Sequence, residues 1–207
     1  MKNIKNIIFD LGKVITDIDF SKTIIAFGLL SNKSTEQILK MHQQTMLFKD
    51  MEEGKYTAPE FRKALNKHLN TKATDKELND AWNAIIGKTP WHRLEIINSL
   101  RPKYNTFLLS NTNEIHIDFV NNFLKKEYSI ENLNPFFDKV YYSHKIGFRK
   151  PKLAAYQYVL DDSNIKAEES VFIDDLQQNL DAANQLNINT ILKKDDESLE
   201  DLLKNFL

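Results

Sequence analysis

The sequence predicts an α/β fold in which a doubly wound parallel sheet carries a small bundle of helices inserted after its first strand. Short apolar runs, rich in β-branched and aromatic residues, recur along the 207-residue chain and are followed by turn- or cap-forming residues, which is typical of buried strands. Helical patterns separate the later runs, and this alternation indicates a parallel sheet. Roughly ninety residues separate the first two runs, far more than one crossover needs, so that interval must hold a unit of its own.

The strands of this Rossmann-like sheet are expected at the apolar runs. They are residues 4–9, 104–109, 139–142, 170–173 and 188–192. Residues 1–19 and 90–207 then form the α/β core. Its helices are expected up to Leu100, from Glu114, from Pro151, from Leu176 and at the end of the chain.

Residues 20–89 are expected to form the inserted helical bundle. Four stretches there have helical patterns, namely residues 20–30, 35–49, 58–69 and 75–86. A serine or threonine precedes three of them, where its side-chain oxygen can cap the free amides of a first turn. These N-cap residues are Ser34, Thr57 and Thr74.

Polar side chains follow three of the predicted strands, at the point where each strand ends. Asp10 follows the first strand, Ser110 and Asn111 follow the second, and Asp174 and Asp175 follow the fourth. Ligands of open α/β sheets bind in the crevice beyond the carboxyl ends of the strands. These side chains are therefore expected to converge in space.

Together with Lys150, these residues supply what phosphoryl transfer requires, which is mainly positioning and charge compensation. Asp10 is a carboxylate that can attack phosphorus and form an aspartyl-phosphate. Ser110 offers a hydroxyl and nearby backbone amides to a phosphate oxygen, and Lys150 offers a positive charge.

The acidic residues at the strand ends predict a magnesium site. Asp10, Asp174 and Asp175 are hard oxygen ligands, and Mg²⁺ takes one or two carboxylates while waters and phosphate complete its octahedron. Three carboxylates beside one lysine repel one another without a cation. Electrostatics therefore predicts the same Mg²⁺ cofactor as the pattern does.

Four motifs, in order and spacing, cover essentially the whole chain. They are Phe9-Asp10-Leu11-Gly12-Lys13-Val14, Leu109-Ser110-Asn111-Thr112-Asn113, Arg149-Lys150-Pro151, and Phe172-Ile173-Asp174-Asp175 with Asn179. They resemble the motifs of the haloacid dehalogenase (HAD) superfamily, in its subfamily I with a helical cap. Within it, the chain looks most like the bacterial α-D-glucose-1-phosphate phosphatases and the phosphatase domain of soluble epoxide hydrolases. The stretch from Val14 to Phe20 is similar to the former in particular.

The resemblance implies a catalytic role for each motif. It implies that Asp10 is the nucleophile and a metal ligand, that the backbone carbonyl of Gly12 is a second ligand, and that Lys150 neutralises Asp10 and the phosphate. Asp175 aligns with the acidic metal ligand of the last motif, and Asp174 supports it directly or through water.

The resemblance also assigns the phosphate and the insertion. Ser110 and the amide of Asn111 are expected to hold the phosphoryl oxygens. Residues 20–89 are expected to be the cap, a lid that excludes water and contacts the leaving group of the substrate.

Gly12 departs from the pattern of the superfamily. Most of its phosphatases carry an aspartate there as general acid and base, which is worth a factor of about 10²–10⁴ in rate. The backbone metal contact survives, but the proton shuttle does not. A sugar 1-phosphate suits such an enzyme, because its anomeric oxygen leaves with little help. A second departure is Lys13, where glycine is commoner; its charge is expected either near the phosphate or in solvent.

Five residues are candidates to replace the missing acid, and the sequence does not rank them. They are Asp17, Asp19, Glu52, Glu53 and His42. Aromatic side chains of the insertion such as Phe48 and Trp82 are expected to pack in the core or between core and cap, where an aromatic ring can also stack on a sugar. His42 and His116 are expected to be structural rather than catalytic.

Composition narrows the partners of the protein. The net charge is −1, which gives no basic footprint for nucleic acid, and the absence of cysteine excludes disulfides and thiol catalysis. No apolar stretch approaches the roughly 18 residues that span a membrane. We therefore expect a cytoplasmic monomer or homodimer whose partner is a small phosphorylated metabolite, with no nucleic acid and no membrane.

The leading prediction is a Mg²⁺-dependent phosphatase that hydrolyses a small phosphate monoester, such as glucose 1-phosphate, through an aspartyl-phosphate. A signalling receiver module also groups acids, a hydroxyl and a lysine around Mg²⁺. It carries its acidic pair on the first strand, however, and has no place for the insertion. A catalytically weak HAD-like protein that binds a ligand or regulates a partner is an alternative, because Gly12 lacks the acid.

A metal-independent 2-haloacid dehalogenase is a further alternative within the superfamily. It shares the nucleophilic aspartate and the cap. The pair Asp174 and Asp175 argues against it, because without Mg²⁺ these carboxylates would repel the carboxylate of the substrate.

Overall fold

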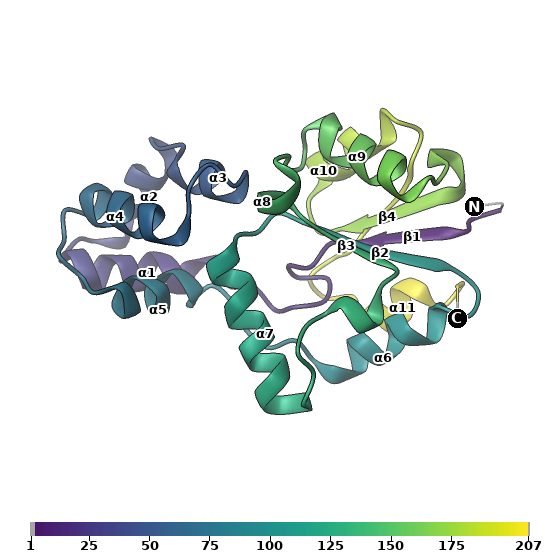
Figure 1. The fold of residues 1–207 in the computed structure, drawn as a ribbon, viewed down its shortest axis with the longest axis horizontal. Helices are drawn as coiled ribbons and strands as arrows, with labels where there is room; N and C mark the ends of the chain where they lie inside the picture. The colour runs from purple at the N-terminus through teal and green to yellow at the C-terminus, as the bar shows by residue number, and fades with distance from the viewer. Residues whose placement is uncertain (1–2, 207) are drawn as a thin grey trace.

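The computed structural model describes residues 3–206 and shows a parallel sheet between two layers of helices (Figure 1). The sheet has five strands in the order β3-β2-β1-β4-β5. They are β1 (Asn6–Phe9), β2 (Asn105–Ser110), β3 (Lys139–Tyr142), β4 (Ser170–Asp174) and β5 (Asn189–Leu192). The predicted doubly wound α/β sheet is therefore confirmed, and the strand limits differ from the prediction only at their ends.

Helices of the core cover both faces of the sheet (Figure 1). They are α6 (Trp91–Leu100), α7 (Glu114–Tyr128), α8 (Ser143–Ile146), α9 (Leu153–Ser163), α10 (Gln177–Asn184) and α11 (Leu199–Leu203), with short 3₁₀ turns η1 (Asn134–Phe136) and η2 (Ala167–Glu169). The helix expected from Pro151 begins instead at Leu153, because Pro151 and Lys152 form a turn.

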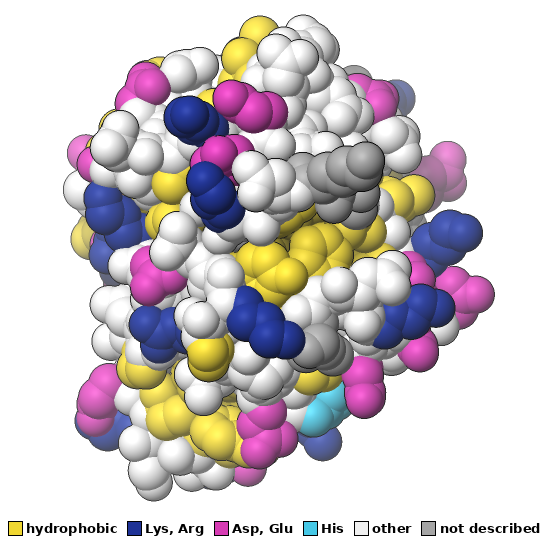
Figure 2. Space-filling model, turned by 90° about the vertical axis from the view of Figure 1, so that its right-hand side faces the viewer, with side chains coloured by type: hydrophobic (Ala, Val, Ile, Leu, Met, Phe, Trp, Pro, Cys, Tyr) yellow, Lys and Arg dark blue, Asp and Glu magenta, His cyan; other side chains and the backbone are white. Residues whose placement is uncertain are grey.

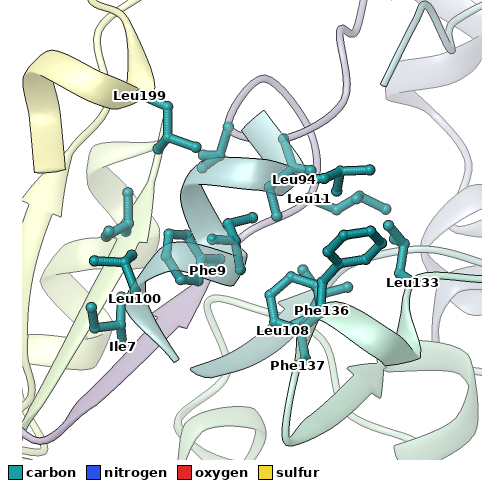
Figure 3. Packing of buried hydrophobic residues seen from close by; sticks show 14 of the residues in the cluster. Ile7, Phe9, Leu11, Leu94, Leu100, Leu108, Leu133, Phe136, Phe137 and Leu199 are labelled. Atoms are coloured by element: carbon teal, nitrogen blue, oxygen red, sulfur yellow. The ribbon is translucent and has the colours of Figure 1, made fainter. Parts of the chain in front are cut away.

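The side chains of the central strand β1 alternate between the two faces, as a strand requires. Ile7 and Phe9 belong to a buried cluster with residues of α6, α7 and α11, and Ile8 belongs to a second cluster with residues of α9 and α10. Figure 3 shows the first cluster, in which Phe9 meets Phe137 edge to face with ring centroids 6.2 Å apart. Every residue of β1 is buried. Packing on both faces of this strand therefore fixes the position of Asp10, which directly follows it.

The inserted segment forms five helices rather than the four predicted. They are α1 (Phe20–Ser31), α2 (Thr35–Gln43), α3 (Leu47–Glu52), α4 (Ala58–Leu69) and α5 (Asp75–Asn83). Their inward-facing side chains make a third buried cluster, centred on aromatic residues. The three predicted N-caps are confirmed, and each forms a reciprocal capping box with a glutamine or glutamate three residues later.

The expected helix over residues 35–49 is interrupted at residues 44–46, and this prediction was wrong. The hydroxyl of Thr45 accepts a hydrogen bond from the amide of Leu47 at 3.1 Å, which favours a new start over continuation. The new helix α3 turns Leu47, Phe48 and Met51 into the cluster. Burial of these three side chains outweighs the propensity of a continuous helix.

Two extended segments connect the helical insertion to the sheet and lie side by side. The amide of Asp19 donates to the carbonyl of Ile85, and the amide of Gly87 donates to the carbonyl of Asp17. This pairing ends α5 at Asn83, before the limit at residue 86 that the pattern predicts.

The surface of the core mixes charges of both signs. On the face in Figure 2, lysine and arginine side chains lie beside aspartate and glutamate side chains rather than in a separate field. Among the described helices, none is long and apolar enough to cross a membrane.

Candidate active site

The strand register places Asp10 beside Asp174. Phe9 of β1 lies opposite Ile173 of β4, and the amide of Asp10 donates to the carbonyl of Ile173 at 2.9 Å. On the other side of β1, strand β2 ends at Ser110. The predicted strand-end residues are therefore brought together at one edge of the sheet.

Lys150 lies between two of the carboxylates. Its Nζ is 2.7 Å from Oδ1 of Asp10 and 2.7 Å from Oδ2 of Asp174, and its side chain is only 1% exposed. The side chain of Asn111 forms two hydrogen bonds with the backbone of Lys150. Its Oδ1 accepts from the Lys150 amide at 2.8 Å, and its Nδ2 donates to the Lys150 carbonyl at 2.9 Å. Asn111 thus positions the lysine, a role that the sequence did not indicate.

Asp174 and Asp175 differ in their surroundings. Asp174 is fully buried, and its carboxylate also accepts from the amide of Leu176 at 2.8 Å and from Nδ2 of Asn179 at 2.9 and 3.0 Å. Asp175 is partly exposed, and its nearest cation is Nζ of Lys13 at 3.8 Å. Asp175 therefore lines the cavity, whereas Asp174 does not.

The carboxylates at this edge of the sheet carry more negative charge than the nearby lysines offset. Burial raises the pKa of Asp10 to about 7, against the opposing effect of Lys150. Burial and the neighbouring Asp174 raise the pKa of Asp175. The pKa of Lys150 is also raised, because its two carboxylate partners outweigh its burial. Lys150 and the exposed, more distant Lys13 do not balance three carboxylates where little water reaches them.

The carboxylates fit a divalent metal ion. Asp10, Asp174 and Asp175 each offer one oxygen, and these oxygens all lie within 4.8 Å of one another. Carboxylate oxygens with room for waters and phosphate are what Mg²⁺ prefers. The donor chemistry and the shortage of positive charge thus agree on the same ion.

Lys13 occupies a backbone conformation that favours glycine. Its φ is 58°, in the left-handed region that costs an ordinary residue about 1–2 kcal/mol. Its Nζ lies 3.3 Å from Asp195 and 3.8 Å from Asp175. Of the two expectations for this residue, the structure supports a charge at the site edge.

The space beside Gly12 is already filled. A Cβ atom at this position would lie 3.2 Å from Cγ1 of Ile18, tighter than an ordinary contact. An acid cannot be added here without a shift of Ile18, so any proton donor must come from another element.

A cavity of about 430 Å³ lies between these strand ends and the inserted helices. Of the five candidate acids, only Glu52 and His42 line it. Asp17 pairs with Arg93 at 2.8 Å, Asp19 caps α1 by accepting from the amide of Ser21, and Glu53 pairs with lysines outside the cavity.

His116, for which the sequence predicts a structural role, lines the cavity as well. Its ring stacks on Trp82 with centroids 4.5 Å apart, and its Nε2 lies 3.2 Å from the carbonyl of Trp82. Burial lowers the pKa of His116 to about 4, so the ring is neutral at pH 7. It joins α7 of the core to α5 of the insertion.

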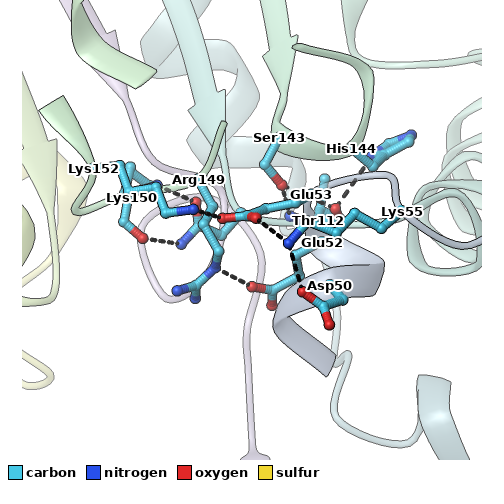
Figure 4. A network of polar contacts seen from close by, with 11 residues as sticks. Asp50, Glu52, Glu53, Lys55, Thr112, Ser143, His144, Arg149, Lys150 and Lys152 are labelled. Atoms are coloured by element: carbon cyan, nitrogen blue, oxygen red, sulfur yellow. Dashed lines mark hydrogen bonds and ion pairs between the residues drawn. The ribbon is translucent and has the colours of Figure 1, made fainter. Parts of the chain in front are cut away.

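Arg149 stands in one of the motifs, but no function was predicted for its side chain. Its Nε donates to Oε2 of Glu52 at 2.8 Å (Figure 4). The two residues are 97 positions apart, and no local pattern signals such a contact.

The fold is a doubly wound parallel sheet with a carboxylate-rich edge and a buried lysine. The chain belongs to the haloacid dehalogenase-like hydrolase family, because a model of that family, described as a haloacid dehalogenase-like hydrolase, matches residues 4–187. The predicted superfamily is therefore confirmed. The closer likeness to glucose-1-phosphate phosphatases stays a prediction.

Relatives from Bacteroides thetaiotaomicron are similar over nearly the whole chain. A D-ribitol-5-phosphate phosphatase is 35% identical over 189 residues, or 90% of each protein. The crystal structure of the HAD family enzyme bt-2542 is 31% identical, with a TM-score of 0.90 and coverage of 98% of this chain and 99% of that one. The same enzyme in complex with magnesium and inorganic phosphate has a TM-score of 0.84 at 31% identity, and the match covers 94% and 96% of the two chains.

Proposed function

We propose that this hydrolase is a Mg²⁺-dependent phosphatase, which cleaves a small phosphate monoester through an aspartyl-phosphate on Asp10. One observation carries the proposal: the buried ammonium of Lys150 lies 2.7 Å from both Asp10 and Asp174, with Asp175 beside them. A nucleophile, its counter-charge and a metal-ligating set thus meet at one point.

Each residue of the site has a step to perform. Asp10 attacks phosphorus, so that a bond to its carboxylate oxygen forms as the bond to the alcohol oxygen breaks. Lys150 stays protonated and holds Asp10 in place, while Ser110 and the amide of Asn111 orient the phosphoryl oxygens. Water then attacks phosphorus, the bond to Asp10 breaks to regenerate its carboxylate, and inorganic phosphate leaves; the proton that this water loses balances the one that the departing alkoxide takes from solvent.

The residues that would hold Mg²⁺ are Asp10, Asp175 and, through its carbonyl, Gly12. When bound there, the ion would supply positive charge that offsets the charge of the phosphoryl oxygens. Asp174 supports this set through its own hydrogen bonds to Leu176 and Asn179. The relative of known structure that was crystallised with magnesium and phosphate supports this choice of ion.

The substrate that we propose is a sugar phosphate or a sugar-alcohol phosphate. Glucose 1-phosphate is the substrate that the sequence predicts, because its anomeric oxygen needs little protonation and no acid stands at Gly12. D-ribitol 5-phosphate is the alternative, supported by the phosphatase that is 35% identical. A cavity of about 430 Å³ is at the small end of the range for metabolite sites. We place this reaction in the cytoplasm, where small phosphorylated metabolites are made.

Two other functions remain to be tested against this one. A HAD-like protein that binds without turnover would keep the site but release no phosphate. A metal-independent dehalogenase would have to accept a substrate carboxylate beside Asp174 and Asp175, and that repulsion disfavours it.

The test is phosphate release from a panel of sugar phosphates, sugar-alcohol phosphates and nucleotides, with Mg²⁺ and with EDTA. Wild type is compared with Asp10→Asn and with Asp196→Asn, the same substitution at an exposed site. Release that requires Mg²⁺ and Asp10, and that persists in Asp196→Asn, supports the proposal. No release from any member of the panel contradicts it, and chloride release from a haloacid without metal would identify the dehalogenase.

A further inference from the structure

The inserted helices and the segment that leads from them back to the core contribute the wall of the cavity opposite the strand ends. Its lining residues are mostly aromatic or aliphatic, namely Phe20, His42, Phe48, Glu52, Trp82, Ile85 and Ile86. The rings form a continuous set: Phe48 stacks on Trp82 at 5.1 Å and on His42 at 4.7 Å. Such faces pack against the C–H groups of a carbon chain.

Glu52 and Arg149 form an ion pair on this wall, across the junction of α3 and the core (Figure 4). The Nε to Oε2 distance is 2.8 Å, and the side chains are 21% and 22% exposed. Both residues line the cavity. Within the described part of the chain, no hydrogen bond reaches Oε1 of Glu52 or the two terminal nitrogens of Arg149.

This wall is mostly apolar, and its one ion pair leaves it without net charge. Glu52 and Arg149 are the charged side chains among the described lining residues that lie away from Asp10, Lys13, Lys150 and Asp175, and their charges cancel. The histidines do not alter this balance, because burial lowers the pKa of His42 and brings that of His116 to about 4.

A neutral pair with free hydrogen-bonding atoms suits hydroxyl groups. A hydroxyl donates to a carboxylate oxygen and accepts from a guanidinium nitrogen, so it can use both sides of the pair. The indole nitrogen of Trp82 is also buried without a hydrogen-bond partner in the described residues, and an unpaired buried donor is costly. A negatively charged group on the leaving group would instead lose its hydration beside a guanidinium whose charge Glu52 already offsets.

We propose that the Glu52–Arg149 pair is the specificity element of this enzyme, and that it selects an uncharged, polyhydroxylated leaving group over an anionic one. The inference rests on the proposed phosphatase function, and it narrows the substrate to phosphates of neutral sugars or sugar alcohols. Phosphorylated sugar acids, bisphosphates and nucleotides are disfavoured by the same pair.

The test compares two substrates that differ only in charge at the far end: D-glucitol 6-phosphate and 6-phospho-D-gluconate. Wild type should prefer the first in kcat/KM by at least about tenfold. Glu52→Gln leaves Arg149 without its carboxylate, so the guanidinium can take the carboxylate of the gluconate. The preference should fall by about 10- to 100-fold, as expected for a charge-assisted hydrogen bond.

Glu53→Gln is the matched control. Glu53 is the C-cap residue of α3 and pairs across the same junction with Lys152, but it does not line the cavity. Its variant should keep the wild-type preference within about twofold. An equal change in Glu53→Gln would show that docking of α3, and not the charge on the wall, sets the preference, and would overturn the inference.

Arg149→Gln provides an independent check with the opposite sign. This variant leaves the charge of Glu52 without its partner, so the preference for the glucitol over the gluconate should increase. If the ratio of the two kcat/KM values equals that of wild type in both Glu52→Gln and Arg149→Gln, the inference is overturned. Each ratio is taken within one variant, so a loss common to both substrates cancels. Phosphate release with unchanged ratios rejects the specificity inference alone, whereas no release from either substrate or from p-nitrophenyl phosphate rejects the phosphatase as well.

Discussion

Replacing Lys150 by methionine removes the one buried positive charge of the site and keeps the length of the side chain. The ammonium lies 2.7 Å from a carboxylate oxygen of Asp10 and of Asp174, and the three groups are almost entirely buried. Removing one partner of a buried ion pair costs about 3–5 kcal/mol. In metal-free protein of this size, where about 2–4 °C corresponds to each kcal/mol, the unfolding midpoint should fall by roughly 6–20 °C.

Activity should fall further than stability explains. The lysine offsets charge at the nucleophile in a site with little water, and one such preorganised group is worth about 10²–10³ in rate. Because Lys150 also positions Asp10, we expect kcat/KM to fall by at least about 10³ at a temperature where the variant is folded.

The assay is phosphate release with saturating Mg²⁺, together with thermal unfolding in EDTA. Lys166→Met, at an exposed lysine, is the matched control and should change neither quantity. A loss of activity below tenfold in Lys150→Met would refute the reasoning, since the charge that serves the phosphate would then lie elsewhere. An unfolding midpoint within 2 °C (about 1 kcal/mol) of wild type would refute the expected loss of stability.

Three other changes have defined outcomes. Asp10→Asn should abolish turnover while the far-ultraviolet circular dichroism spectrum stays that of wild type; residual activity above about 1% would remove the nucleophile assignment. Gly12→Asp should broaden activity toward ordinary alkyl phosphates, and more so when Ile18→Ala clears the contact at 3.2 Å; an unchanged substrate profile in the double variant counts against the leaving-group argument. His116 has a pKa of about 4 in the folded protein, below its unfolded value of about 6.5. The unfolded chain therefore binds the proton first, and stability should fall by about 3 kcal/mol as the pH drops from 6.5 to 4. Chemical denaturation across this range measures the slope, which His116→Gln should lose; an equal slope in that variant would show that another group titrates.

Local patterns in the sequence predicted the limits of a helix correctly where one local interaction sets them. The helix over residues 58–69 begins and ends where predicted, because the capping box of Thr57 and Glu60 satisfies its first amides. The interruption at residues 44–46 escaped prediction, since it depends on burying the side chains of α3 in a cluster drawn from all five inserted helices.

The fold class, the order of the motifs and the residues gathered around Asp10 could all be predicted from the sequence alone. These follow from strand periodicity and from polar residues directly after strands, because parallel strands present their carboxyl ends at one edge. Both are properties of short segments, and a single sequence records them fully.

The tertiary structure, and no pattern in the sequence, sets which side chains line the cavity. It paired Glu52 with Arg149 across 97 positions, placed Ile18 against Gly12 and left Glu52 and His42, of the five candidate acids, on the cavity wall. Each of these contacts depends on how the inserted helices dock on the core. That docking is the sum of many weak packing terms between distant segments, and no local pattern encodes it.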